Sequence, residues 1–170
     1  KLFEDFETSL YSDDLADPVK GYAGYIDVDS FINYYIIQEI TKNIDGNLRK
    51  SSFITIEAGG KMEMYHVWDF DLTLGNCGYF DGSVGNGPEG FWIKDFTSGC
   101  WRGENWFNLM MKDPAFTTKL KARWNGLKPE LMKITDFIDD QALILDKAQE
   151  RNFKKWSITS SVDWVKFPSL

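Results

Sequence analysis

The sequence has little of what several common kinds of site require. Its two cysteines and single histidine are too few to complete a zinc site. No apolar run approaches about 18 residues, the length that suggests a membrane-spanning helix, and no signal peptide opens the chain. Lys and Arg number 19 against 26 Asp and Glu, giving a net charge of −7. This balance argues against a general nucleic-acid-binding protein, which needs a basic face.

The residues that are present describe a globular chain with large side chains in its core. The 170 residues are 43% hydrophobic and 16% aromatic, with 13 Phe and 7 Trp. Each large aromatic ring can bury about 150–250 Å². A chain of this length is one domain or a fragment of a larger one. Because Lys1 is not a native start, we expect further sequence upstream of it.

The two cysteines, Cys77 and Cys100, bracket a loop. They can form a disulfide if the protein lies in an oxidising compartment. Two unlinked, partly buried thiols are the alternative. The sequence leaves both possibilities open.

Hydrophobic spacing predicts an α+β fold that is mostly helical. A short amphipathic helix is expected at residues 2–11. A nearly central helix is expected to run from a cap within residues 27–29 to Gly46, because Asp is a favoured N-cap and Gly a favoured stop. Alternating residues then predict a β-hairpin, with strands at 52–57 and 61–67.

The C-terminal part of the chain is expected to be helical. From Asn105 onward, apolar residues recur at helical spacing, and we expect these apolar faces to lie in the core. One helix, capped by Asp113, is predicted to end loosely at Gly126. A longer helix is predicted to open at Lys128-Pro129, since Pro suits the first helical turn.

The second strand leads into an acidic turn, Trp68-Asp69-Phe70-Asp71. Asp69 and Asp71 are two residues apart, so on an extended backbone their side chains project on one side. Two such carboxylates can hold a hard cation such as Mg²⁺, usually with phosphate as a further ligand. The alternative is a pair of solvated aspartates or turn caps. Trp68 is expected to anchor the turn in the core, and His66 to be a packed strand residue.

The order of features along the chain suggests a site. The central helix ends in Asn43-Ile44-Asp45, and the hairpin should bring this helix end close to Asp69. Protein kinases show the same order, in which one carboxylate orients the acceptor hydroxyl and another holds magnesium on the phosphates. Arg49 could contact phosphate or lie in a solvated loop. Glu39, inside an apolar helix, is expected to reach solvent or to pair with Arg49 or Lys50.

Two other uses of the carboxylates compete with this interpretation. A calcium-binding loop is excluded, because its sixth position should be Gly and is Leu74, and its twelfth should be Glu and is Phe80. Glycoside hydrolysis, with Asp45 and either Asp69 or Asp71 flanking a sugar, is permitted by the aromatic content. No cleft pattern in the sequence demands it.

Several segments together resemble the CotH family of bacterial spore-coat kinases. The resemblance extends over nearly the whole chain, and the segments that carry it are Asp27-Val28-Asp29-Ser30-Phe31-Ile32, Glu39 to Asp45, Val67 to Asn76, Trp106 to Phe116, and Arg151-Asn152-Phe153. The most specific element is the Trp-Asp-Phe-Asp turn with its upstream Asn-x-Asp.

The resemblance implies an atypical, protein-kinase-like fold, of which this chain would form the C-terminal lobe with an inserted hairpin. It implies binding of ATP and Mg²⁺ and phosphorylation of Ser or other protein hydroxyls. Asp69 falls at the family's metal-binding aspartate and Asp45 at its other essential aspartate. Asp71 is a second candidate metal ligand, and Asn76 also matches the motif.

Two departures from the kinase pattern matter. Asp-Phe-Gly reads Asp-Phe-Asp here, and position 50 is Lys rather than Asn. The second-metal ligand is therefore unassigned, with Asn43 and Asn47 as candidates. Residues 1–44 contain no glycine-rich phosphate loop followed by a strand lysine, so we expect the nucleotide-clamping lobe to lie upstream. The isolated chain should then bind ATP weakly and be inactive alone.

Further hypotheses remain beside the kinase. A non-catalytic binding domain, or pseudokinase, can use the same fold, because fold does not fix function. A carbohydrate-active enzyme is less favoured. The resemblance implies a cell-surface or secreted location and a protein substrate, whereas the net charge of −7 argues against a nucleic-acid partner.

Overall fold

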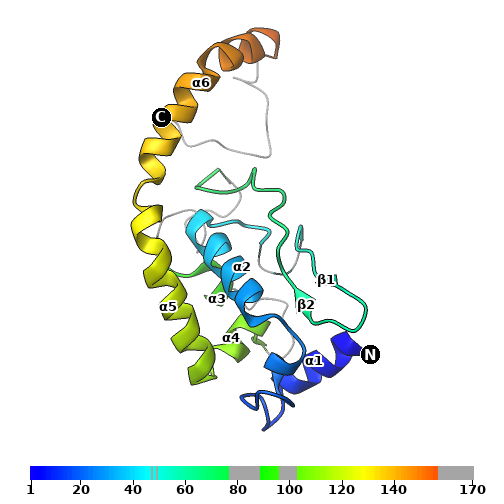
Figure 1. Ribbon diagram of the computed structural model, residues 1–170. Coiled ribbons are helices and arrows are strands. Elements are labelled where there is room, and N and C mark those ends of the chain that lie inside the picture. Colours follow the sequence, from blue (N-terminus) through cyan, green and yellow to red (C-terminus); the bar gives the residue numbers. More distant parts are fainter. Residues whose placement is uncertain (47, 49, 77–88, 96–102, 157–170) are drawn as a thin grey trace.

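The computed structural model describes residues 1–46, 48, 50–76, 89–95 and 103–156 (Figure 1). The described part is mostly helical with a small two-stranded antiparallel sheet, so the predicted α+β class is confirmed. In chain order the elements are α1 (Leu2–Leu10), η1 (Tyr22–Gly24), α2 (Val28–Thr41), β1 (Thr55–Ile56), β2 (Met62–Glu63), α3 (Trp92–Asp95), α4 (Trp106–Met110), α5 (Pro114–Leu131) and α6 (Ile134–Lys155).

Helix α2 forms the centre of the folded body (Figure 1). Asp27 caps it, since the Asp27 side chain accepts a hydrogen bond from the Ser30 backbone N–H at 3.0 Å. The helix ends at Thr41 rather than at Gly46, because Lys42 takes a left-handed conformation as C-cap (φ 51°). Half of its 14 residues are buried: Ser30, Phe31, Ile32, Tyr34, Tyr35, Ile36 and Gln38.

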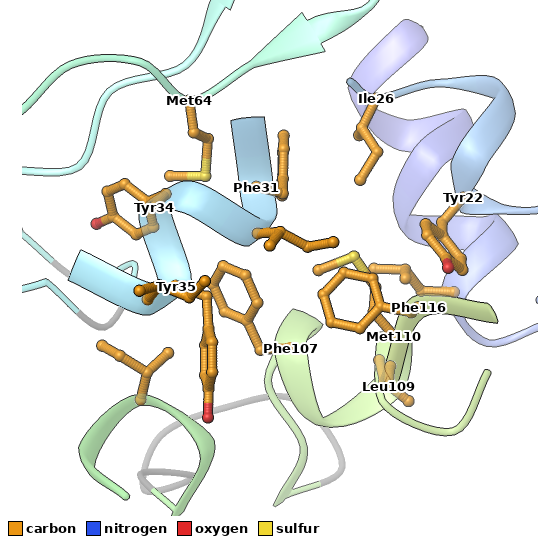
Figure 2. Close-up of a cluster of buried hydrophobic side chains, with 14 of the residues drawn as sticks. Tyr22, Ile26, Phe31, Tyr34, Tyr35, Met64, Phe107, Leu109, Met110 and Phe116 are labelled. Carbon is orange, nitrogen blue, oxygen red and sulfur yellow. The ribbon is translucent and has the colours of Figure 1, made fainter. Parts of the chain in front are cut away.

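Phe107 of α4 occupies the middle of the hydrophobic core (Figure 2). It is fully buried, and its ring centre lies 5.2 Å from that of Tyr35 and 6.3 Å from that of Tyr34. Nearby, the Tyr22 hydroxyl donates to Asp113 Oδ2 at 2.7 Å, while Asp113 also caps α5 through the Ala115 N–H. Aromatic packing therefore joins α2 to α4, and the Tyr22–Asp113 hydrogen bond joins η1 to the start of α5.

The segment from residue 62 to residue 74 is attached to both ends of α2. At the start of the helix, Asp27 N–H donates to the Met62 carbonyl at 2.8 Å, and Met62 N–H donates to the Tyr25 carbonyl at 2.9 Å. The Met64 N–H donates to the buried hydroxyl of Ser30 at 3.1 Å. At the far end, residues 72–74 bond to residues 41–44. The segment therefore runs along α2 in the same direction.

The sheet is shorter than the sequence predicts. β1 and β2 pair only at Thr55 with Glu63 and at Ile56 with Met62. Beyond them, Met64 is buried against α2 as its position on the strand predicts, whereas His66 is exposed. The strand prediction extended too far because the chain leaves its hairpin partner to follow α2.

The predicted helix break near Gly126 is wrong. α5 continues through Gly126 and Pro129 to Leu131, and α6 begins at Ile134. Local propensity favours a break at both residues, but the amphipathic stripe that includes Phe116, Leu120 and Leu127 packs on the core as one continuous helix. Packing of the stripe outweighs the local preference here.

The prediction that all later helical faces lie in the core is correct only in part. Phe107, Leu109, Met110 and Phe116 are buried, whereas α6 has no buried residue. α6 extends beyond the end of α2, where no described element covers it (Figure 1). Within the described ranges, no helix combines the length and apolar character needed to cross a membrane.

Replacing Ser30 by Ala tests the attachment of the 62–74 segment. The change leaves the buried Met64 N–H without its hydroxyl acceptor, so the free energy of unfolding should fall by about 1–3 kcal/mol. Ser12→Ala is the control, since the Ser12 hydroxyl only donates to the Ser9 carbonyl within the same turn. Chemical denaturation measures both, and equal losses would contradict the attachment.

Candidate functional site

The acidic turn lies against the end of α2. Leu74 N–H donates to the Thr41 carbonyl at 2.6 Å, and Ile44 N–H donates to the Leu72 carbonyl at 3.4 Å. Both bonds join residues about 30 positions apart in the sequence, so a long loop is closed at this point. The structure thus brings the helix end that carries Asn43 and Asp45 to the segment that follows Asp69 and Asp71.

Hydrogen bonds fix the backbone of Asp45, whereas its carboxylate has no partner among the described residues. Its N–H donates to Asn43 Oδ1 at 3.2 Å, and its carbonyl accepts from Lys50 N–H at 3.4 Å. The side chain is half-buried and has no hydrogen bond or ion pair to another described residue. Asn43 is buried, and its Nδ2 has no partner in the described part. A buried donor without a partner in the described part of the chain is unusual.

Asp69 and Asp71 are exposed at the turn. Asp69 Oδ2 accepts from the Ser51 hydroxyl at 2.8 Å, and Ser51 follows Lys50, whose N–H bonds to Asp45. The Asp69 carboxylate is therefore linked by a hydrogen bond to Ser51, and Ser51 is the neighbour in sequence of Lys50, which bonds to the Asp45 carbonyl. The Asp71 carboxylate is free among the described residues, while the Asp71 carbonyl accepts from Asn76 Nδ2 at 2.8 Å.

Two expectations about this turn are wrong. Trp68 is 62% exposed, so it does not anchor the turn in the core. The backbone at Asp69 is not extended but left-handed, with φ 62°, because the chain turns there. The two carboxylates are consequently placed by the turn itself and not by the alternation of a strand.

Left-handed backbone gathers at this site. Every described non-glycine residue with positive φ lies between positions 42 and 74: Lys42 (51°), Leu48 (66°), Ser51 (50°), Asp69 (62°) and Leu74 (53°). This conformation costs about 1–2 kcal/mol for a residue with a Cβ. Such strain clusters at functional sites, where the surrounding structure maintains it.

Glu39 and Lys42 attach α3 to the same helix end. Glu39 accepts hydrogen bonds from the N–H groups of Trp92 (2.7 Å) and Lys94 (3.0 Å). Lys42 Nζ lies 4.0 Å from Glu39 Oε2, with both side chains only 10% exposed, and it donates to the carbonyls of Glu89 and Gly90. Among the described residues Glu39 therefore pairs with Lys42 and α3, so the suggested pairing with Lys50 is wrong, whereas Arg49 lies outside the described residues.

The Glu39 carboxylate also affects the neighbouring Tyr35. Burial, and then the negative charge of Glu39, raise the pKa of the Tyr35 hydroxyl above its usual range. Tyr35 is therefore neutral at physiological pH. Sequence reasoning missed Lys42; the spacing of Glu39 and Lys42, three residues apart on one helix face, was the signal that could have found it.

Four residues named from the sequence lie outside the described residues: Asn47, Arg49, Cys77 and Cys100. Their roles, and the pairing of the cysteines, stay predictions. Across the described ranges, no group of three His, Cys, Asp or Glu side chains is arranged to hold a metal ion. A cation at Asp69 and Asp71 would need oxygen ligands from elsewhere, as Mg²⁺ commonly takes from water and phosphate.

These features define an α+β domain in which the end of α2 lies against an acidic turn, and both contain residues with left-handed backbone. A protein-family model described as CotH kinase protein matches residues 1–166, and the chain belongs to the CotH family. No curated protein and no solved structure matches it significantly.

Replacing Leu74 by Gly tests whether the site holds strained backbone. Leu74 is 68% exposed with φ 53°, so Gly relieves the left-handed strain and removes little buried area. The free energy of unfolding should stay unchanged or rise by up to about 1 kcal/mol. Ile56→Gly, at an exposed strand position without positive φ, should lower it. A clear fall in the free energy of unfolding of Leu74→Gly would contradict the claim that the backbone at Leu74 is strained.

Proposed function

We propose that this chain is the acceptor-orienting and metal-binding part of an ATP-dependent protein kinase. The observation that carries the proposal is the pair of backbone hydrogen bonds from Leu74 to Thr41 and from Ile44 to Leu72. They join a helix end bearing Asp45 to a turn bearing Asp69 and Asp71. The description of the matching family as a kinase protein supports the same activity.

Asp69 and Asp71 are the residues that would hold Mg²⁺. Their carboxylates are exposed, and no cation among the described residues neutralises them. Mg²⁺ is commonly bound by one or two carboxylates together with water and substrate phosphate, so the absence of a third acidic ligand in the described part fits this ion. When bound, it would neutralise negative charge on the phosphates.

Asp45 is the residue that would orient the acceptor hydroxyl. Among the described residues its carboxylate has no partner, while its N–H donates to Asn43 Oδ1 and its carbonyl accepts from the Lys50 N–H. A positioned carboxylate can accept the proton of a Ser hydroxyl as that oxygen attacks phosphorus. Asn43 is buried, its Nδ2 has no partner among the described residues, and its Oδ1 holds the Asp45 N–H.

The nucleotide is proposed to be ATP, clamped by a lobe upstream of Lys1 that supplies a strand lysine. The substrate class is a protein carrying Ser or another hydroxyl. A cell-surface or secreted location is proposed from the family resemblance. Because the proposed nucleotide-clamping lobe is not part of this chain, we expect the isolated chain to bind ATP weakly. Tight binding of ATP in calorimetry would contradict this expectation.

Replacing Asp69 or Asp45 by Asn tests the proposal in a natural protein that carries this domain with its upstream sequence. Asn tolerates the left-handed backbone at position 69, so the fold should persist while the charge is lost. Mg²⁺-dependent transfer of label from ATP to protein should fall by about 100-fold or more. Asp14→Asn, an exposed residue of the N-terminal part, should leave transfer unchanged.

The outcome also separates the alternatives. Undiminished transfer in Asp69→Asn would defeat the metal-binding assignment. No transfer by the unmodified protein, together with retained binding of a partner protein, would favour the non-catalytic binding domain. Release of sugar without a need for Mg²⁺ would favour a carbohydrate-active enzyme.

A further inference from the structure

The Ser51 hydroxyl and the Asp69 carboxylate join two strained positions of the chain. Ser51 Oγ donates to Asp69 Oδ2 at 2.8 Å across 18 positions of sequence. Both residues have left-handed backbone, with φ 50° at Ser51 and 62° at Asp69, and this conformation costs free energy for a residue with a Cβ. Strain retained at both ends of one hydrogen bond indicates that the contact has a function.

The residues on either side of Ser51 are fixed to the rest of the fold. On one side, the Lys50 N–H donates to the Asp45 carbonyl at 3.4 Å. On the other, Ser52 Oγ donates to the Lys50 carbonyl at 3.1 Å and lies 2.7 Å from the hydroxyl of Tyr34, a buried residue of α2. The loop that presents the Ser51 hydroxyl is therefore attached to the central helix.

The Ser51 hydroxyl leaves Asp69 able to bind a cation. A carboxylate has about four lone-pair sites on its two oxygens, and Ser51 uses one of those on Oδ2. The hydroxyl carries no charge, so it does not repel a cation as an ammonium group in the same place would. In the part of the chain that the structure describes, Ser51 is the hydrogen-bond partner of this carboxylate, and Oδ1 stays open to an ion.

We propose that Ser51 is a positioning residue of the metal site, whose hydroxyl holds the Asp69 carboxylate in one orientation before the ion binds. This inference rests on the proposed metal-binding role of Asp69. An exposed side chain loses rotational freedom when it binds a ligand, and that loss weakens binding. A carboxylate that is already oriented loses less, so the affinity of the turn for Mg²⁺ is higher.

A purely structural role of the same hydrogen bond makes a different prediction. If the bond only attached the loop to the turn, its removal would lower stability, and any change in metal affinity would follow from that loss. A positioning role separates the two quantities. Gly at position 51 relieves the left-handed strain while it removes the hydroxyl, so stability and metal affinity should then change in opposite directions.

Titration of the chain with Mg²⁺ alone tests the role of Ser51. The NMR chemical shifts of the backbone amides of residues 70–72 give the dissociation constant at the turn. Ser51→Ala removes the hydroxyl and keeps Cβ, and Ser51→Gly also relieves the strain. Each should raise the dissociation constant about fivefold. In chemical denaturation, Ser51→Gly should be at least as stable as the unmodified chain.

The neighbouring Ser52 provides a matched control. Its hydroxyl contacts Tyr34 and the Lys50 carbonyl. Ser52→Ala should lower the denaturation midpoint, because the loop loses these contacts. The dissociation constant for Mg²⁺ should change by less than about twofold, since the Ser51 hydroxyl is intact and Lys50 still bonds to Asp45.

Three results would overturn the inference and leave Asp69 as a metal ligand. They are an unchanged Mg²⁺ affinity in both Ser51 variants, a Ser52→Ala variant that binds Mg²⁺ as weakly as they do, and a loss of stability in Ser51→Gly equal to that in Ser52→Ala. A fourth result, no shift of the amides of residues 70–72 when Mg²⁺ is added to the unmodified chain, would overturn both this inference and the metal-binding assignment.

Discussion

Backbone hydrogen bonds at the two ends of α2 determine where the acidic turn lies. At the start of the helix, the backbone of Met62 bonds to Tyr25 and Asp27. At its end, Leu74 bonds to Thr41 and Leu72 bonds to Ile44. A segment fixed at both ends of a buried helix cannot move away from it without breaking bonds at one end. The carboxylates of the turn are therefore positioned by α2, the described helix with the largest number of buried residues, although they are themselves exposed.

The same helix end is held from a second side. Glu39 binds the N-terminal N–H groups of α3, and the Trp92 indole donates to the Ile44 carbonyl at 3.2 Å. Phe107 packs on Tyr34 and Tyr35 of α2 and joins this helix to α4. A rigid scaffold of this kind can maintain left-handed backbone at Lys42 and Asp69. Strain at the site is thus offset by packing in the core.

The sequence predicted those parts of the structure that depend on local chemistry. The caps at Asp27 and Asp113, the buried face of α2 and the approach of the helix end to the turn were all predictable. The left-handed turn at Asp69 and the partners of Glu39 were not, because they depend on segments distant in sequence. The exposure of α6 was also missed, since an apolar stripe does not say whether its partner lies in the same chain.

The central claim is that the end of α2 and the acidic turn face one shared cation site. Line broadening of backbone amide resonances by added Mn²⁺ tests it most directly, because broadening depends on distance from the bound ion. The account predicts that amides of residues 43–46 and 69–72 broaden together, and that Asp69→Asn removes both effects. Broadening of one segment alone, or of neither, would contradict it.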